Sequence, residues 1–342
     1  MFFSSWTERL LRYYYLGRDK LLHFFGIKGR SAWISAPICV TEHMEREHPE
    51  SCKRLEIIEK FLRRSPIWVM LQKITAPEVS DVQLARVHSR KYLRFLECKT
   101  PVSGSLKIEE DTYLSANTLK SARYAAGAAI KAVDMVMKKQ AKNAFCAIRP
   151  PGHHASDERA SGFCFINNIA VAAMHAIAEY HLERVAILDF DLHHGDGTEK
   201  IFRDDKRVLF LSLFEYPLYP VMDLATYPEC PNNTVRTPLK AGDGSNEFRD
   251  AIREQWLSRL DVFQPELILC SAGFDGHKND PLGHLNLTED DFEWLTKKVM
   301  LLANRYASGR IVSVLEGGYN PRTLAKSVKA HLSCLVKASP FY

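Results

Sequence analysis

Short apolar runs alternate with helical segments from about Ala32 onwards, and this alternation limits the fold more strongly than any other feature. The runs cover Ala144 to Ile148, Val185 to Phe190, Val208 to Leu213, Leu267 to Ala272 and Ile311 to Leu315. Strands that are apolar throughout are buried on both faces, which is typical of parallel sheets covered by helices. Helices are predicted over Cys52 to Leu62, Asp81 to Leu96, Ser115 to Lys138, Asn167 to Tyr180, Gly244 to Leu260 and Thr288 to Tyr306. The sequence therefore predicts one α/β domain without an internal repeat or linker.

The first 30 residues differ in character from the predicted domain, which covers residues 31–342. They hold six basic and two acidic side chains, so they contribute four of the five net positive charges. Phe3, Trp6, Leu10 and Tyr14 recur at intervals of three and four, which predicts an amphipathic helix. Such a helix packs on its own domain or docks to a partner or a membrane surface. Because its basic residues follow the apolar start, a secretory signal peptide is not expected.

Composition excludes several classes of protein. A net charge of +5 is too mild to indicate direct nucleic-acid binding. No run of about 18 apolar residues is present, so a membrane-spanning helix is not expected. The eight cysteines form no CxxC pair, which favours free thiols in a reducing compartment. We therefore expect a cytoplasmic protein, although this pattern does not separate the cytoplasm from the nucleus or from export into another cell.

The residues that follow four of the apolar runs indicate a metal site. Ligands bind at the carboxyl ends of the strands in open parallel sheets. Asp191 and His193 follow one run with i, i+2 spacing, and Asp275 follows another. Two carboxylates and one imidazole leave coordination positions open, as in a catalytic zinc site. Fe²⁺ would accept the same ligands.

Other residues at these strand ends suit proton transfer and transition-state stabilisation. The adjacent His153 and His154 are predicted to take a proton from water and return it to a leaving amine. Asp189 and Asp196 are predicted to orient the imidazoles, and Tyr319 could donate to an oxyanion. Aromatic residues in two further motifs could line a slot for a lysine side chain, or could serve only core packing; these motifs contain Gly162, Phe163 and Tyr219.

The segments RPPGHHA, SGFCFINN, DFDLHHGDGTE, SAGFDGHKNDPLG and EGGY together resemble the histone deacetylase superfamily, which includes acetylpolyamine amidohydrolases and acetoin-utilisation proteins. The residues in these motifs are most similar to those of class II deacetylases and their bacterial relatives. The resemblance implies a single arginase/deacetylase-like domain with a central, mostly parallel eight-stranded sheet flanked by helices. It also implies one zinc ion on Asp191, His193 and Asp275, and it makes His154 the general base and acid, with His153 as electrostatic partner. Tyr319 would polarise the acyl carbonyl.

The resemblance further implies structural potassium. The corresponding positions are Asp189, Asp191, His193, Ser212 and Leu213, partly through backbone carbonyls. A second monovalent site would map near Phe202, Asp205 and Val208.

Several positions bear on the substrate. Tyr319 is not the histidine of weakly active class IIa members, so catalytic competence is expected. Leu282 stands where polyamine-selective relatives carry an acidic gatekeeper, which favours acyl-lysine. Phe214 replaces a family histidine, and residues 221–235 lack the usual glycine-rich turn, so the rim of the slot departs from the family pattern.

The sequence thus predicts a metal-dependent hydrolase of acetyl-lysine in a protein or peptide. The alternatives are a small-molecule deacylase that acts on acetylpolyamines or longer acyl-lysines, an arginase-like ureohydrolase, and a module that binds acyl-lysine without cleaving it. Gly276 and His277 follow Asp275 where a ureohydrolase would need a further aspartate, which counts against that enzyme class.

Overall fold

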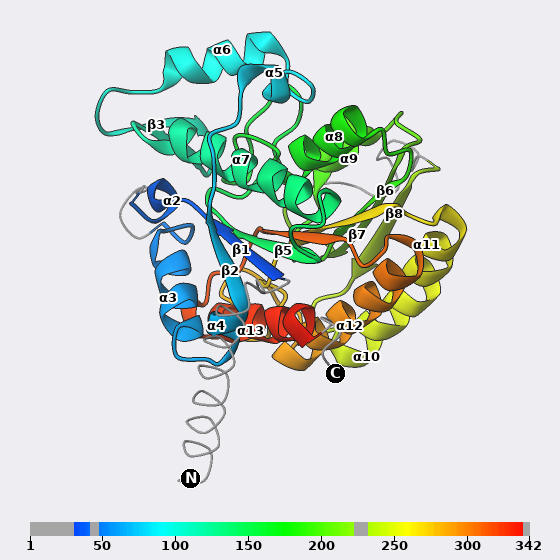
Figure 1. The fold of residues 1–342 in the computed structure, drawn as a ribbon. Helices are drawn as coiled ribbons and strands as arrows, with labels where there is room; N and C mark the ends of the chain where they lie inside the picture. The colour runs from blue at the N-terminus through cyan, green and yellow to red at the C-terminus, as the bar shows by residue number, and fades with distance from the viewer. Residues whose placement is uncertain (1–30, 42–47, 222–231, 338–342) are drawn as a thin grey trace.

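The computed structural model describes residues 31–41, 48–221 and 232–337, which are arranged around an eight-stranded sheet (Figure 1). The strand order is β2-β1-β5-β10-β9-β6-β7-β8, and every neighbouring pair is parallel. The strands are β1 (Ser31–Ser35), β2 (Leu71–Thr75), β5 (Asn143–Ala147), β6 (Val185–Asp189), β7 (Val208–Glu215), β8 (Thr234–Leu239), β9 (Leu267–Ala272) and β10 (Ile311–Leu315). The predicted α/β class is confirmed. The predicted extension over residues 1–30 lies outside the described residues.

Helices cover both faces of this sheet. On one face α7 (Thr118–Met137) contacts β1, β5 and β10, and α8 (Asn168–Tyr180) and α9 (Asp196–Phe202) continue the layer (Figure 1). The opposite layer contains α3 (Lys53–Leu62), α4 (Ile67–Met70), α10 (Ser245–Ala251), the π-helical segment η1 (Ile252–Leu257), α11 (Ser258–Phe263), α12 (Glu289–Tyr306) and α13 (Pro321–Lys337). The remaining elements are α2 (Pro37–Thr41), α5 (Asp81–Leu84), α6 (Arg90–Lys99) and the hairpin of β3 (Ser105–Glu109) and β4 (Thr112–Ser115).

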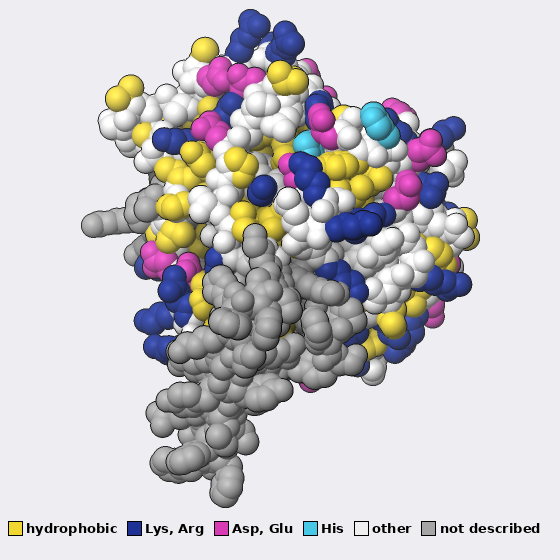
Figure 2. Space-filling model, viewed as in Figure 1, with side chains coloured by type: hydrophobic (Ala, Val, Ile, Leu, Met, Phe, Trp, Pro, Cys, Tyr) yellow, Lys and Arg dark blue, Asp and Glu magenta, His cyan; other side chains and the backbone are white. Residues whose placement is uncertain are grey.

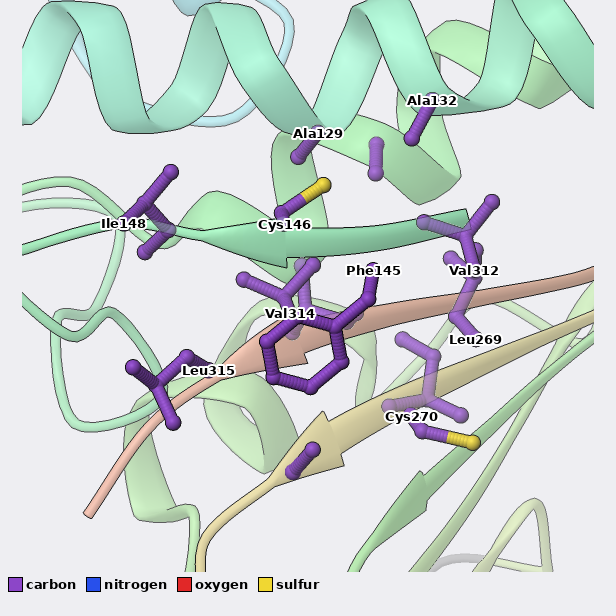
Figure 3. Packing of buried hydrophobic residues seen from close by; sticks show 14 of the residues in the cluster. Ala129, Ala132, Phe145, Cys146, Ile148, Leu269, Cys270, Val312, Val314 and Leu315 are labelled. Carbon is purple, nitrogen blue, oxygen red and sulfur yellow. The ribbon is translucent and has the colours of Figure 1, made fainter. Parts of the chain in front are cut away.

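The two faces of β5 show how the layers pack. Ala129 of α7 lies over Cys146, with Ala132 further along the helix on the same side, while Phe145 points to the other side of the sheet (Figure 3). Small side chains on α7 let the helix approach the strand closely, and all four residues are buried. Phe145 stacks on Trp33 of β1 with ring centroids 5.6 Å apart. The core therefore fixes the middle strands that carry the ionisable residues at their ends.

Some predicted elements are wrong in extent. The single helix predicted over Asp81 to Leu96 is two helices, α5 and α6, because Ser89 is extended and caps α6 by accepting from Tyr92 N. The chain turns there because His88 is buried and its Nε2 accepts from Asn167 N at 3.0 Å. The helix predicted over Gly244 to Leu260 contains the π-helical segment η1 and extends to Phe263.

Basic side chains do not form one continuous area on the face shown in Figure 2. Lys and Arg side chains lie there in small groups that alternate with acidic and hydrophobic ones. Within the described ranges, every helix is too short or too polar to cross a lipid bilayer.

His331 of α13 is expected to make the fold less stable in mild acid. Its ring nitrogens lie 2.7 Å from Thr296 Oγ1 and 2.8 Å from Ser313 Oγ, and burial lowers its pKa to about 3. Between pH 6.5 and pH 3 the unfolded chain therefore binds a proton here that the folded chain does not. Stability falls as the pH drops through this window. We expect His331 alone to cost about 2 kcal/mol of unfolding free energy between pH 7 and pH 5.

Urea unfolding at pH 7 and pH 5 measures this loss. The control is His331→Gln, which keeps a donor and an acceptor but cannot be protonated. Other histidines titrate equally in both proteins, so the variant should lose about 2 kcal/mol less than the wild type over the same interval. Equal losses would show that His331 does not contribute.

Candidate metal and catalytic centre

Four neighbouring strands, β5, β10, β9 and β6, end at the same edge of the sheet. Because they are parallel, the residues that follow them meet at one place. The side chains concerned are His153 and His154 after β5, Asp191 and His193 after β6, Asp275 after β9, and Glu316 and Tyr319 after β10.

Asp191, His193 and Asp275 form a cluster that could hold a metal ion. Their potential ligand atoms all lie within 4.8 Å of one another. His193 Nδ1 is 3.1 Å from Asp191 Oδ1 and 3.3 Å from Asp275 Oδ2. Backbone donors hold the other carboxylate oxygens: Gly317 N donates to Asp191 Oδ2 at 2.7 Å, and Leu192 N donates to Asp275 Oδ1 at 2.9 Å. One oxygen of each carboxylate is thereby turned towards His193.

The cluster has the properties that a divalent cation requires. Asp275 Oδ2 is buried and accepts no hydrogen bond of good geometry from the described residues, and a buried carboxylate oxygen without a partner is costly. Two carboxylates and one imidazole match a catalytic zinc site, and Fe²⁺ also suits this donor set. The residues present therefore fit the predicted metal ion.

Two glycines allow the carboxylates to approach this closely. A Cβ atom on Gly273 would lie 2.1 Å from Asp191 Oδ2, and a Cβ atom on Gly317 would lie 2.0 Å from Asp275 Oδ2. Any other residue at either position would push a carboxylate out of the cluster.

Electrostatics in the cluster also favour a cation. Burial would lower the pKa of His193, but hydrogen bonds and charges from Asp191 and Asp275 raise it to about 10. Burial and the charge of Asp191 raise the pKa of Asp275. The raised pKa of His193 reflects the negative charge beside it, and a bound cation would displace the proton that this charge attracts.

His153 and His154 lie beside the cluster, each bonded to its own carboxylate. His153 Nδ1 is 3.0 Å from Asp189 Oδ2, His154 Nδ1 is 2.7 Å from Asp196 Oδ1, and the two imidazole centroids are 4.0 Å apart. Burial would lower the pKa of His153, but Asp189 and Asp191 raise it well above its usual value. Burial and the charge of His153 lower the pKa of His154 to about 4. The two shifts favour a proton in the His153–Asp189 pair and a free base at His154.

Glu316 holds the loop that carries these histidines. Its Oε2 accepts from Gly152 N at 2.6 Å and from His153 N at 3.3 Å. The other side of the loop meets α9, where Thr198 N donates to the His153 carbonyl at 3.0 Å. Glu316 was not among the predicted site residues, although it directly follows a buried strand, which is the signal that identifies the others.

Tyr319 is anchored at its backbone and over its ring. Its N–H donates to Asp280 Oδ2 at 2.6 Å, and the Arg54 guanidinium carbon is 4.9 Å from the ring centroid. Burial raises the pKa of Tyr319 well above its usual value, so the hydroxyl keeps its proton and can donate a hydrogen bond. Arg54 also donates to the Gly318 carbonyl at 2.7 Å and to the Glu316 carbonyl. This arginine therefore fixes the turn that presents Tyr319.

A buried ion pair supports Arg54 from the other side. Glu50 Oε1 accepts from Arg54 at 3.1 Å, and Glu50 Oε2 accepts from Arg149 at 2.7 Å. Burial would raise the pKa of Glu50, but the two guanidinium groups lower it. These three side chains are almost fully enclosed. None of the three could be assigned a role from the sequence, because Arg149 lies 99 residues from Glu50 along the chain.

The predicted slot residues surround the cluster. The Tyr219 ring lies 5.0 Å from His154 and 6.2 Å from His193, and its hydroxyl is 2.6 Å from Ser161 Oγ. The Phe163 ring lies 5.9 Å from that of Tyr319. Gly162 has φ +52°, and a Cβ atom there would lie 2.4 Å from the His154 ring. Aromatic rings thus border both His154 and Tyr319.

Leu282 is half-buried and belongs to the same loop system. Its N–H donates to Asp280 Oδ1 at 3.2 Å, while Asp280 Oδ2 holds Tyr319 N. One carboxylate therefore anchors both the predicted gatekeeper position and Tyr319. Of the atypical segment 221–235, residues 222–231 lie outside the described residues.

The predicted potassium positions lie at the end of β6, in the adjacent part of β7 and in the turn that follows β6. Asp189 pairs with Ser212 in the sheet register, and Asp191 N donates to Asp189 Oδ1 at 3.2 Å. His194 Nδ1 is 2.9 Å from Ser212 Oγ, and the Phe214 ring packs 4.7 Å from that of His194. The remaining residues of this set, His193 and Leu213, border the same strand ends.

Comparison with known proteins agrees with this geometry. The histone deacetylase domain matches residues 48–335. The chain is 39% identical over 284 residues to "Probable deacetylase" of Archaeoglobus fulgidus. This match covers 80% of this chain and 77% of that protein. It is 35% identical to "Histone deacetylase 6" of Caenorhabditis elegans over 84% of this chain and 31% of that protein. It is 37% identical to "Polyamine deacetylase HDAC10" of Mus musculus over 75% of this chain and 40% of that protein. The chain thus spans less than half of these two eukaryotic relatives.

A solved structure, described as "Crystal Structure of HDA15 HD domain", superimposes with a TM-score of 0.83 at 29% sequence identity, covering 90% of this chain and 88% of that one. Zinc and potassium are typical of the family that these matches define. The domain match, the similar relatives and the shared fold show that the chain belongs to the histone deacetylase family.

Proposed function

We propose that this chain is a zinc-dependent amidohydrolase that removes acetyl groups from lysine side chains of proteins or peptides. The observation that carries the proposal is geometric. A three-ligand cluster lies beside two imidazoles that are each hydrogen-bonded to a separate carboxylate, and aromatic side chains border the same place. The family match supports hydrolysis of an acetylated amine.

Asp191, His193 and Asp275 would hold the zinc ion. When bound, zinc polarises the acyl carbonyl and lowers the pKa of water to about 7. The same three ligands would also bind Fe²⁺. The fold family also supports a structural potassium ion, for which the carbonyls and side chains at the end of β6 and in the adjacent part of β7 are the proposed ligands.

The chain's own residues would move the protons. His154, held by Asp196, accepts a proton from the attacking water and then gives it to the departing lysine amine. His153, charged beside Asp189, stabilises developing negative charge. The Tyr319 hydroxyl donates a hydrogen bond to the oxyanion of the acyl group.

A panel of three substrates tests the proposal. We expect the zinc-loaded protein to hydrolyse an acetyl-lysine peptide with a higher kcat/KM than acetylputrescine or a myristoyl-lysine peptide. Leu282 supplies no charge to attract the second ammonium of a polyamine, and the aromatic slot suits a single alkyl stem. Preference for acetylputrescine or the myristoyl peptide would instead support the small-molecule or long-chain deacylase. Tight peptide binding without product would support a non-catalytic binding module.

Leu282→Glu tests the gatekeeper position. A carboxylate there should raise kcat/KM for acetylputrescine about fivefold, the effect of roughly 1 kcal/mol for a partly exposed ion pair. The matched control is Leu282→Gln, because glutamine is the same size as glutamate but carries no charge. An equal gain in both variants would show that shape, and not charge, selects the substrate at this position.

A further inference from the structure

Three backbone carbonyls converge on the side-chain amide of Asn233, in the turn before β8. Asn233 Nδ2 lies 2.8 Å from the Phe202 carbonyl oxygen, 3.0 Å from that of Asp205 and 3.1 Å from that of Val208. These carbonyls come from the last residue of α9, the following turn and the first residue of β7. We call the three oxygens the carbonyl cage.

Converging backbone carbonyls replace the hydration shell of potassium in proteins. The cage comprises the three residues to which the family resemblance assigns a second monovalent cation. Here a neutral amide nitrogen lies among these oxygens and supplies the positive ends of its N–H bonds. An amide has two N–H groups, so three carbonyls must share them. From this geometry we infer that Asn233 replaces the second cation, so that the chain fills the cage with its own amide and binds no potassium there.

The electrostatic surroundings of the cage give independent support. A cavity of about 760 Å³ reaches Asn233, and its lining includes four cationic side chains and one acidic side chain. The cationic residues are Arg184, Arg203, Lys206 and Arg259, and the acidic residue is Asp204. Arg184 pairs with Glu266 at 3.9 Å, but the lining still carries more positive than negative charge, which disfavours a further cation at this surface.

The acid within the cage region is already neutralised. The Asp205 carboxylate accepts from Arg207 Nη2 at 2.7 Å and from Arg207 Nε at 2.9 Å. These hydrogen bonds to Arg207 lower the pKa of Asp205 and also compensate its charge. The carboxylate therefore adds little attraction for an ion. The amide N–H groups of Asn233 compensate the partial negative charges of the three carbonyl oxygens.

This replacement bears on the centre through α9. The helix begins at Asp196, which orients His154, and ends at Phe202, whose carbonyl belongs to the cage. The Asn233 amide therefore fixes the far end of the helix that positions the proposed base, without an ion. The inference concerns ion binding only, and it stands whether or not the proposed reaction is correct.

Anomalous scattering from thallium, a potassium substitute, tests the inference directly. Crystals of the full chain in thallium acetate should show no anomalous peak among the Phe202, Asp205 and Val208 oxygens. The variant Asn233→Ala should show a peak there, which adds one site per chain relative to the wild type. The matched control Asn232→Ala alters the neighbouring exposed residue and should behave as the wild type. Asn233→Ser serves if the alanine variant does not fold.

Thermal unfolding gives a second measurement. Replacing choline chloride by KCl at constant ionic strength should raise the Tm of Asn233→Ala by about 2 °C more than that of the wild type or Asn232→Ala. A thallium peak in the wild-type cage, with the Asn233 side chain displaced, would overturn the inference. A cage without a peak in both the wild type and a folded Asn233 variant would also overturn it, because the carbonyls would then not form a cation site.

Discussion

Replacing Asp191 by alanine is expected to abolish zinc binding and to lower turnover of an acetyl-lysine peptide by at least about 10³-fold. Loss of an outer partner of a metal ligand typically costs 10–100-fold, and loss of a ligand should cost more. Asp191 also accepts hydrogen bonds from Gly317 N and His193 N, so its removal also disturbs the backbone at Gly317 and at His193. Metal content by mass spectrometry and turnover by amine release measure the two effects.

Two further variants separate charge from folding. Asp191→Asn keeps an acceptor for Gly317 N but removes the charge, and it should also lose zinc. Asp250→Ala removes an exposed carboxylate that pairs with Arg253, away from the cluster in sequence, and it should retain full zinc and full turnover. Equal turnover in Asp191→Ala and the wild type would exclude the proposed metal chemistry. If Asp191→Ala retained zinc but lost turnover, Asp191 would not be a required zinc ligand.

Replacing Tyr319 by phenylalanine is expected to lower kcat about 10²–10³-fold, the usual effect of losing one donor to an oxyanion. The ring would remain under Arg54, and the backbone would still be held by Asp280, so KM and zinc content should change little. Because burial raises the pKa of this phenol, its loss should act equally across neutral pH. Steady-state kinetics at pH 6 to 8 measure both parameters.

Tyr306→Phe is the matched control. Tyr306 is also hydrogen-bonded to an aspartate, with its hydroxyl 2.7 Å from Asp261, but it lies at the end of α12. That variant should keep the wild-type kcat. If Tyr319→Phe also kept it, the hydroxyl would have no part in the reaction and the proposed oxyanion contact would be lost.

The sequence predicted the middle of the sheet but not its margins. The five apolar runs correspond to β5, β10, β9, β6 and β7, which lie side by side in the sheet. The other three strands lie outside them. β2 and β8 are edge strands with alternating exposure, so their sequences include polar residues and form no continuous apolar run. The total of eight strands could be predicted only from the family resemblance.

A similar division holds for the candidate site. Asp191, His193 and Asp275 could be proposed because each directly follows an apolar run, and the topology brings such positions together. Glu50 and Arg54 could not, because they precede the first of those runs. Only the three-dimensional structure shows that they reach across to Arg149 and to the turn of Tyr319.

β1 has a practical consequence for anyone who produces this protein in fragments. The family match begins at residue 48, but β1 ends at Ser35 and lies between β2 and β5 in the sheet. A clone trimmed to the matched region would leave two strands with unpaired facing edges, which promotes aggregation. Recombinant boundaries should therefore be placed upstream of Ser31, and insoluble product from shorter clones should not be interpreted as a defect of the catalytic residues.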